Sequence, residues 1–87
     1  MIKRYPKKGE YLLRAIPWDS EPFVVKILKD LGKVKNHPYD RVRNYKIRFV
    51  HNHETVGQVC DEFYVWLDAT PETDTIMSED EYLVSLI

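Results

Sequence analysis

FVVKILKDL, residues 23–31, decides between two folds for this chain of 87 residues. As a strand, the stretch places Phe, Val and Ile at alternate positions on one face, and strands favour these residue types. As a helix over about residues 20–31, it has Ser20 as its N-cap and Gly32 just past its end. Its three β-branched residues oppose the helix. We therefore expect a strand here and keep the helix as the alternative.

Segments on both sides of this stretch also read as strands. Residues 45–51 alternate most clearly, with Tyr, Ile and Phe on one face and Lys46 and Arg48 on the other. Residues 33–44 are polar and basic and contain Pro38, so we expect a loop there. The expected strands are residues 10–16, 23–31, 45–51, 56–60 and 63–67.

The C-terminal part carries one helix signal. Ser78 and Glu81 have the spacing of a capping box, and the acidic residues between them suit the positive end of a helix dipole. The sequence therefore predicts an acidic connection over residues 69–78 and a short helix over about residues 79–87. The side chains that this helix is expected to bury are Tyr82, Leu83 and Leu86.

These elements predict one mainly β domain over residues 1–87, built as a partly closed antiparallel barrel with a short C-terminal helix. The alternative is an α+β fold, with the helix at about residues 20–31 lying on an antiparallel sheet.

The order of the segments resembles a Tudor-type, SH3-like small barrel over roughly residues 9–60. The residues that carry the resemblance are Leu12-Leu13-Arg14-Ala15, Phe23-Val24-Val25-Lys26-Ile27-Leu28 and Tyr45-Lys46-Ile47-Arg48-Phe49-Val50. Domains of this family bind methylated peptides through an aromatic cage, and their relatives bind nucleic acid or protein. Where the family has an Asp-Tyr-Gly turn, this chain has His51-Asn52-His53, so the cage tyrosine is missing. The resemblance therefore implies the architecture and not the methyl-binding site.

The cysteine content and the hydropathy of the chain indicate its cellular location. Cys60 is the lone cysteine, which excludes an internal disulfide and indicates a reducing compartment. No apolar run approaches the roughly 20 residues of a membrane span. No apolar segment follows the N-terminal charges, so no signal peptide is expected. We expect a cytoplasmic protein with no membrane partner.

Charge divides along the chain. Residues 1–48 hold all 13 basic residues and 5 acidic ones, a net charge of +8, whereas residues 49–87 hold 9 acidic residues and a net charge of −9. Cations attract phosphates, and aromatic rings stack on unpaired bases. We therefore expect a non-enzymatic binding module that contacts nucleic acid, or an acidic protein surface, unless these cations pair with the acidic half. The expected contact residues are Lys33, Lys35, Tyr39, Arg41, Arg43, Tyr45, Lys46 and Arg48.

A second hypothesis uses the acidic half. A protein-interaction adaptor or inhibitor, such as an accessory protein of a virus or mobile element, would dock through the helix start or through an aromatic patch. The residues expected to form these surfaces are Tyr64, Trp66, Glu79, Asp80 and Glu81. Simpler interpretations are that the acids cap the helix and that the helix covers the two aromatic residues.

The sequence offers little chemistry for an enzyme. His51 and His53 share a strand face if the strand extends that far, and Cys60 and Asp61 have the residue types to complete a metal site. The same Cys60 would need a nearby base to act as a nucleophile. Exposed turn histidines and a structural thiol are the simpler interpretation. We expect no catalytic residues, no metal and no cofactor.

Overall fold

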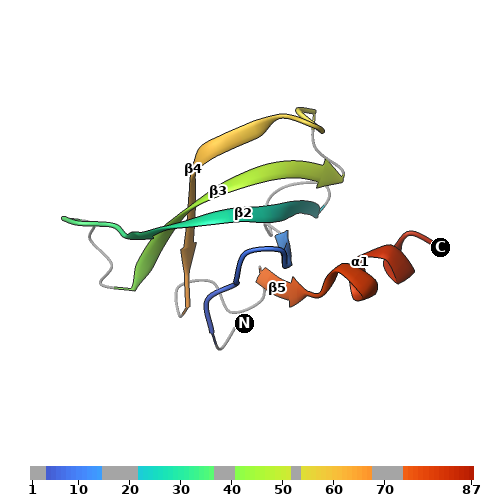
Figure 1. Ribbon diagram of the computed structural model, residues 1–87, viewed down its shortest axis with the longest axis horizontal. Coiled ribbons are helices and arrows are strands. Elements are labelled where there is room, and N and C mark those ends of the chain that lie inside the picture. Colours follow the sequence, from blue (N-terminus) through green and yellow to red (C-terminus); the bar gives the residue numbers. More distant parts are fainter. Residues whose placement is uncertain (1–3, 15–21, 37–40, 52–53, 68–73) are drawn as a thin grey trace.

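The computed structural model describes residues 4–14, 22–36, 41–51, 54–67 and 74–87. They form five strands and one helix: β1 (Tyr11–Arg14), β2 (Phe23–Lys33), β3 (Val42–His51), β4 (Val59–Trp66), β5 (Asp74–Met77) and α1 (Glu79–Ser85). The strands make one sheet in the order β4-β3-β2-β1-β5, and every neighbouring pair is antiparallel (Figure 1). The expected mainly β fold with a short C-terminal helix is confirmed. The alternative helix at about residues 20–31 is wrong, because β2 occupies most of that segment.

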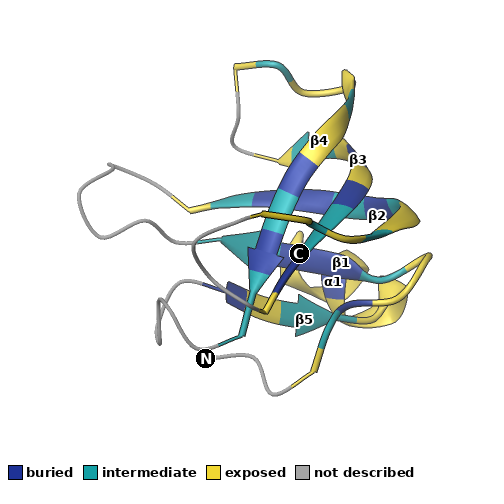
Figure 2. Ribbon diagram, turned by 90° about the vertical axis from the view of Figure 1, so that its left-hand side faces the viewer, coloured by how far each residue is buried: buried dark blue, intermediate teal, exposed yellow. Residues whose placement is uncertain are grey.

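The sheet has an inner and an outer face, and the inner face holds the main core. The alternation of apolar residues expected from the sequence sends Val25 and Ile27 of β2 and Tyr45 and Ile47 of β3 inward, where each is fully buried. Figure 2 shows buried residues in the middle of β2, β3 and β4. The buried members of this core are Leu12, Val25, Ile27, Tyr45, Ile47, Phe63 and Val65.

A smaller cluster on the outer face holds α1. The Tyr82 ring stacks on Tyr11 with centroids 4.3 Å apart, and Val24 completes the buried part of the cluster. The Tyr82 hydroxyl donates to the Val50 carbonyl at 3.3 Å. The predicted capping box is present: the Ser78 hydroxyl accepts from the Glu81 amide, and the Glu81 carboxylate accepts from the Ser78 amide.

The prediction that α1 buries three apolar side chains is wrong for two of them. Leu83 and Leu86 are 52% and 50% exposed, and only Tyr82 is buried. The helix has just seven residues, so it presents a single side-chain position squarely to the sheet.

Two predicted connections contain strand residues. The expected loop 33–44 includes the end of β2 and the start of β3, where Val42 is buried and the Val34 amide donates to the Val42 carbonyl at 3.0 Å. The expected connection 69–78 includes β5, which pairs with β1 along its whole length. The strands in these two segments were not predicted because the segments are largely polar. Strands at a sheet edge or a hairpin end can form with few apolar residues.

β4 replaces the two separate stretches expected at residues 56–60 and 63–67. It bends sharply along its length (Figure 1). A register shift against β3 lies at the bend and leaves Asp61 and Glu62 exposed. Asn44 stabilises the bend, because its side-chain oxygen accepts from the Phe63 amide at 2.9 Å and its nitrogen donates to the Asp61 carbonyl at 3.4 Å.

The bend brings the second half of β4 back toward β1, and Arg14 joins the two. One guanidinium nitrogen donates to the Tyr64 carbonyl at 2.9 Å. The same guanidinium forms a two-bond ion pair with Asp74 of β5, with both bonds at 2.9 Å. Arg14 thus links β4 to β1 and β5 and partly closes the curved sheet.

No helix in the described part of the chain has both the length and the hydropathy that crossing a bilayer requires.

Candidate functional site

The outer face of β2 and β3 carries four cations in two cross-strand pairs. Lys26 lies opposite Arg48, and Lys29 lies opposite Lys46. Facing side chains in such pairs start about 5 Å apart, and successive pairs on one face are about 7 Å apart along the strand. These four residues, Lys26, Lys29, Lys46 and Arg48, form what we call the basic patch.

A bulge in β2 places Lys29 in the patch. By strict alternation Lys29 would follow Ile27 to the inner face. A register shift between Ile27 and Lys29 adds one residue, so Lys29 faces the same side as Lys46. Asp30 is thereby moved to the inner side, opposite Tyr45.

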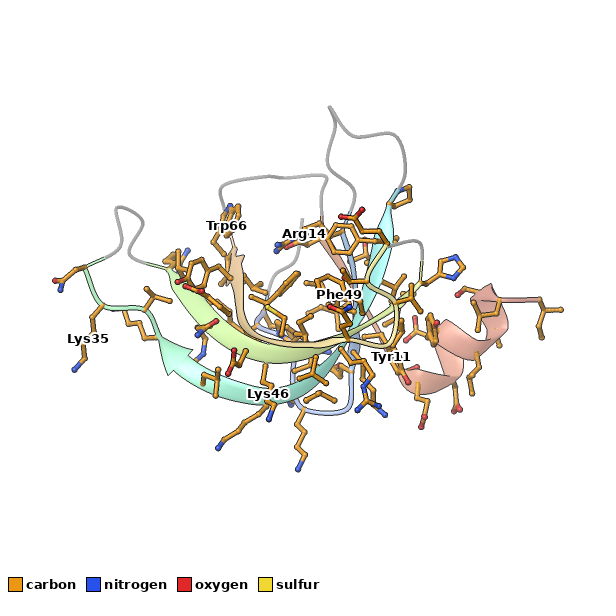
Figure 3. The ribbon with its side chains drawn as sticks, turned by 90° about the horizontal axis from the view of Figure 1, so that it is seen from above. Tyr11, Arg14, Lys35, Lys46, Phe49 and Trp66 are labelled. Carbon is orange, nitrogen blue, oxygen red and sulfur yellow. The ribbon has the colours of Figure 1, made fainter. Side chains whose placement is uncertain are left out.

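The patch is open to solvent. Lys29, Lys46 and Arg48 are exposed and Lys26 is half-buried. Figure 3 shows Lys46 pointing away from the side of the sheet where Arg14, Phe49 and Trp66 lie. The Lys26 ammonium lies 5.7 Å from the centroid of the Tyr11 ring, close enough for a cation–π contact. None of the four makes an ion pair with a residue in the described part of the chain.

The sequence-predicted basic set is divided between two faces. Lys46 and Arg48 belong to the patch. Arg43 lies on the inner side, where it pairs with Asp30 at 2.9 Å and stands 5.5 Å from the centroid of the Tyr5 ring. Lys33 lies opposite Arg43 and is exposed. The expected contact residues therefore do not share one surface, because residues of odd and even number on β3 face opposite sides.

The remaining predicted contact residues lie near the β2–β3 hairpin or in the core. Lys35 is exposed and extends from the hairpin end, far along the molecule from Lys46 (Figure 3). Arg41 is exposed, and its carbonyl accepts from the Tyr5 hydroxyl at 2.6 Å. Tyr39 lies outside the described residues. Tyr45 is fully buried, so its predicted role in stacking on bases is wrong.

Burial also changes the chemistry of Tyr45. Removal of its ring from water raises the pKa of the Tyr45 hydroxyl to about 12, and the negative charge of Asp30 adds to the effect. Tyr45 is therefore a neutral core residue.

Arg14 and Asp74 form a structural site that the sequence did not indicate. Their side chains are only 13% and 4% exposed. The guanidinium carbon lies 4.4 Å from the centroid of the Phe63 ring and 5.3 Å from that of Trp66. The partners are 60 residues apart, so no local pattern predicts the pair. Nε and one terminal nitrogen of Arg14 donate to groups within the fold, which makes this a contact that closes the sheet.

The predicted protein-interaction residues do not form one surface. Tyr64 and Trp66 are half-buried; the Tyr64 hydroxyl donates to Glu62 at 2.8 Å, and Trp66 packs beside Arg14 rather than under α1. Glu79, Asp80 and Glu81 are exposed at the start of α1. Exposed apolar side chains gather at the end of the chain, at Leu83, Val84, Leu86 and Ile87, and others lie at Leu31, Val56 and Val59.

The residues considered for metal binding and nucleophilic chemistry are not brought together. Within residues 4–14, 22–36, 41–51, 54–67 and 74–87, no three His, Cys, Asp or Glu side chains form a metal-binding group. His53 lies outside these ranges. The half-buried Cys60 packs against the inner core, and its thiol donates to the Glu62 carbonyl at 3.5 Å.

No family model, curated protein or solved structure matches this chain. The Tudor-type resemblance therefore remains a prediction.

Proposed function

We propose that the protein is a non-enzymatic binding module whose basic patch contacts the phosphates of nucleic acid. The contrast between its arginines supports this. Arg4, Arg14 and Arg43 each pair with a carboxylate, whereas the patch cations make no ion pair within the described residues. Unpaired cations gathered on one open face form the electrostatic footprint of a polyanion partner.

The energetics of such contacts give the proposal a measurable signature. Each phosphate that a Lys or Arg neutralises releases condensed counterions, so binding weakens steeply as salt rises. Four patch contacts correspond to a slope of log K against log salt of about −3.6 on duplex DNA. Contacts of this kind read no base sequence.

The test is fluorescence anisotropy with labelled nucleic acid at two salt concentrations. The double change Lys46→Gln and Arg48→Gln should lower affinity at least tenfold and reduce the slope by about 1.8, because two phosphate contacts are lost. The matched control is Val84→Glu with Ile87→Glu. It lowers the net charge by the same amount at two positions that are 68% and 105% exposed.

Three results would overturn the proposal. One is an affinity that does not change with salt concentration. Another is an equal loss of affinity in the patch variant and in the control. The third is binding to anionic lipid vesicles with none to DNA or RNA, since that would assign the patch to a membrane surface.

A second candidate function, docking to another protein, is favoured by the end of α1. Four apolar side chains there are at least half exposed, and three acids precede them. Such a helix end suits an apolar groove with a basic rim. Capture of a protein partner that the Val84→Glu, Ile87→Glu variant abolishes, with nucleic-acid binding unchanged, would support it.

We further propose the Tudor-type architecture and a cytoplasmic location. The order of the strand segments supports the former, and the single cysteine supports the latter.

A further inference from the structure

We propose that the ligand of the basic patch is the backbone of a nucleic-acid duplex lying along the β2–β3 hairpin, from the patch toward Lys35. This inference rests on the proposed function and names the form of nucleic acid and its direction.

The arrangement of charge along the hairpin gives the direction. The two patch pairs follow one another along β2 and β3, and these strands run along the longest axis of the molecule (Figure 1). Lys35 continues the row at the hairpin end and extends to the same side of the sheet as Lys46 (Figure 3). From Arg48 to its hairpin end at Val42, β3 covers about 20 Å. The row therefore has the length of several phosphates of one backbone.

Carboxylates border the row on two sides. Asp61 and Glu62 are exposed on β4, beside β3. At the end away from the hairpin, α1 packs over Val24, and its acids Glu79 to Glu81 are exposed. Both groups repel phosphates, so a backbone that crossed the strands toward β4, or continued over α1, would meet like charge. The direction toward Lys35 carries positive charge.

The aromatic residues favour a duplex over an unpaired strand. Proteins that bind single strands add base stacking on aromatic rings to their phosphate contacts. Of the rings near the patch, Tyr11 stacks on Tyr82, and Tyr64, opposite Asn44, is half-buried with its hydroxyl donating to Glu62. The patch presents ammonium and guanidinium groups. A duplex, with twice the phosphate density of one strand, is the form that such a surface binds best.

The experiment compares a duplex of about 20 base pairs with one of its strands, as DNA and as RNA, over a range of salt concentrations. We expect tighter binding to the duplex, with a slope of about −4.5 for five contacts. Lys35→Gln and Lys46→Gln, made singly, should each reduce the slope by about 0.9. The control, Val84→Glu, changes the net charge equally and should leave the slope unaltered.

The failures of the two proposals are distinguishable. Equal or tighter binding to the single strand would overturn the duplex assignment. A slope that responds to Lys46→Gln and not to Lys35→Gln would overturn the direction along the hairpin. Both results leave the patch as a nucleic-acid surface, whereas no binding to either form would overturn this inference and the proposed function together.

Discussion

The arginines on the two faces of the sheet are held in different ways. On the inner side, Arg14 and Arg43 each form an ion pair, with Asp74 and Asp30, and each guanidinium lies over an aromatic ring. On the outer side, the basic patch has no such partner in the described residues. A cation fixed by a carboxylate serves the fold, and one left in solvent is available to a ligand. The difference therefore separates positions where substitution should cost stability from positions where it should cost binding.

The largest expected effect is a loss of stability when Asp74, on the inner side of the sheet, is replaced. Asp74→Ala leaves the guanidinium of Arg14 in a site only 13% exposed, without its counter-ion. Removal of one partner from a buried pair destabilises a protein by about 3–5 kcal/mol. Urea unfolding followed by circular dichroism measures the loss.

The control for this prediction replaces both partners. Arg14→Met with Asp74→Leu removes the pair and leaves no buried charge, so it should be more stable than Asp74→Ala alone. Equal instability of the two variants would show that shape, and not the unpaired charge, sets the cost.

The next largest effect is a dependence of stability on pH that comes from Tyr45, on the inner side of the sheet. Burial raises the pKa of Tyr45 to about 12, above its ordinary value of 10.0. Below about pH 10 both states keep the proton and stability is unaffected. Above it the unfolded chain releases the proton first, so stability falls as pH rises toward 12, by roughly 2 kcal/mol in total.

Urea unfolding at about pH 9 and about pH 11 tests this dependence. Tyr45→Phe has no hydroxyl to titrate, so its stability should fall less over the same interval. An identical decline in both proteins would place the alkaline transition in other groups.

A smaller effect concerns the part of the outer face that α1 covers. Ser78→Ala removes the side-chain oxygen that accepts from the Glu81 amide at 3.1 Å. Loss of such a cap costs about 1 kcal/mol. Ser78→Thr keeps an acceptor and should retain most of the stability in the same unfolding measurement.

The smallest expected effect on stability belongs to the patch itself. Lys46→Gln with Arg48→Gln should change the free energy of unfolding by no more than about 0.5 kcal/mol, since neither side chain has an ion-pair partner in the described residues. Thermal unfolding of the variant beside the wild-type chain checks this. A loss close to that of Asp74→Ala would end the distinction between the two faces.

Local patterns were sufficient for much of the fold. The β-branched residues of β2 favoured a strand, and the spacing of Ser78 and Glu81 predicted where α1 begins. The alternation in β3 also contained the signal that Tyr45 shares a face with apolar residues and not with Lys46. The prediction instead assigned Tyr45 and Lys46 to the same contact set because they are adjacent in the sequence.

Other features depend on long-range contacts that no local pattern shows. The bulge that turns Lys29 outward arises from the pairing of β2 with β3. β5 pairs with the open edge of β1, although only two of its four residues, Ile76 and Met77, are apolar. Pairing of Arg14 with Asp74 requires the whole sheet to curve. The patch was thus half predicted: Lys46 and Arg48 came from the sequence, and Lys26 and Lys29 from the fold.

Closure of the sheet by a side chain has a consequence for its motions. Among the described residues, β1 and β4 meet through side chains, chiefly Arg14, which donates to the Tyr64 carbonyl and lies over the Phe63 ring, and no backbone ladder joins the two strands. Detaching that edge requires the rupture of a few bonds at one residue, whereas β2 and β3 separate only if their full ladder breaks. The Arg14 contacts can therefore open locally while the end of β4 stays paired with β3, so the amide protons in that ladder remain protected when the closure between β1 and β4 opens.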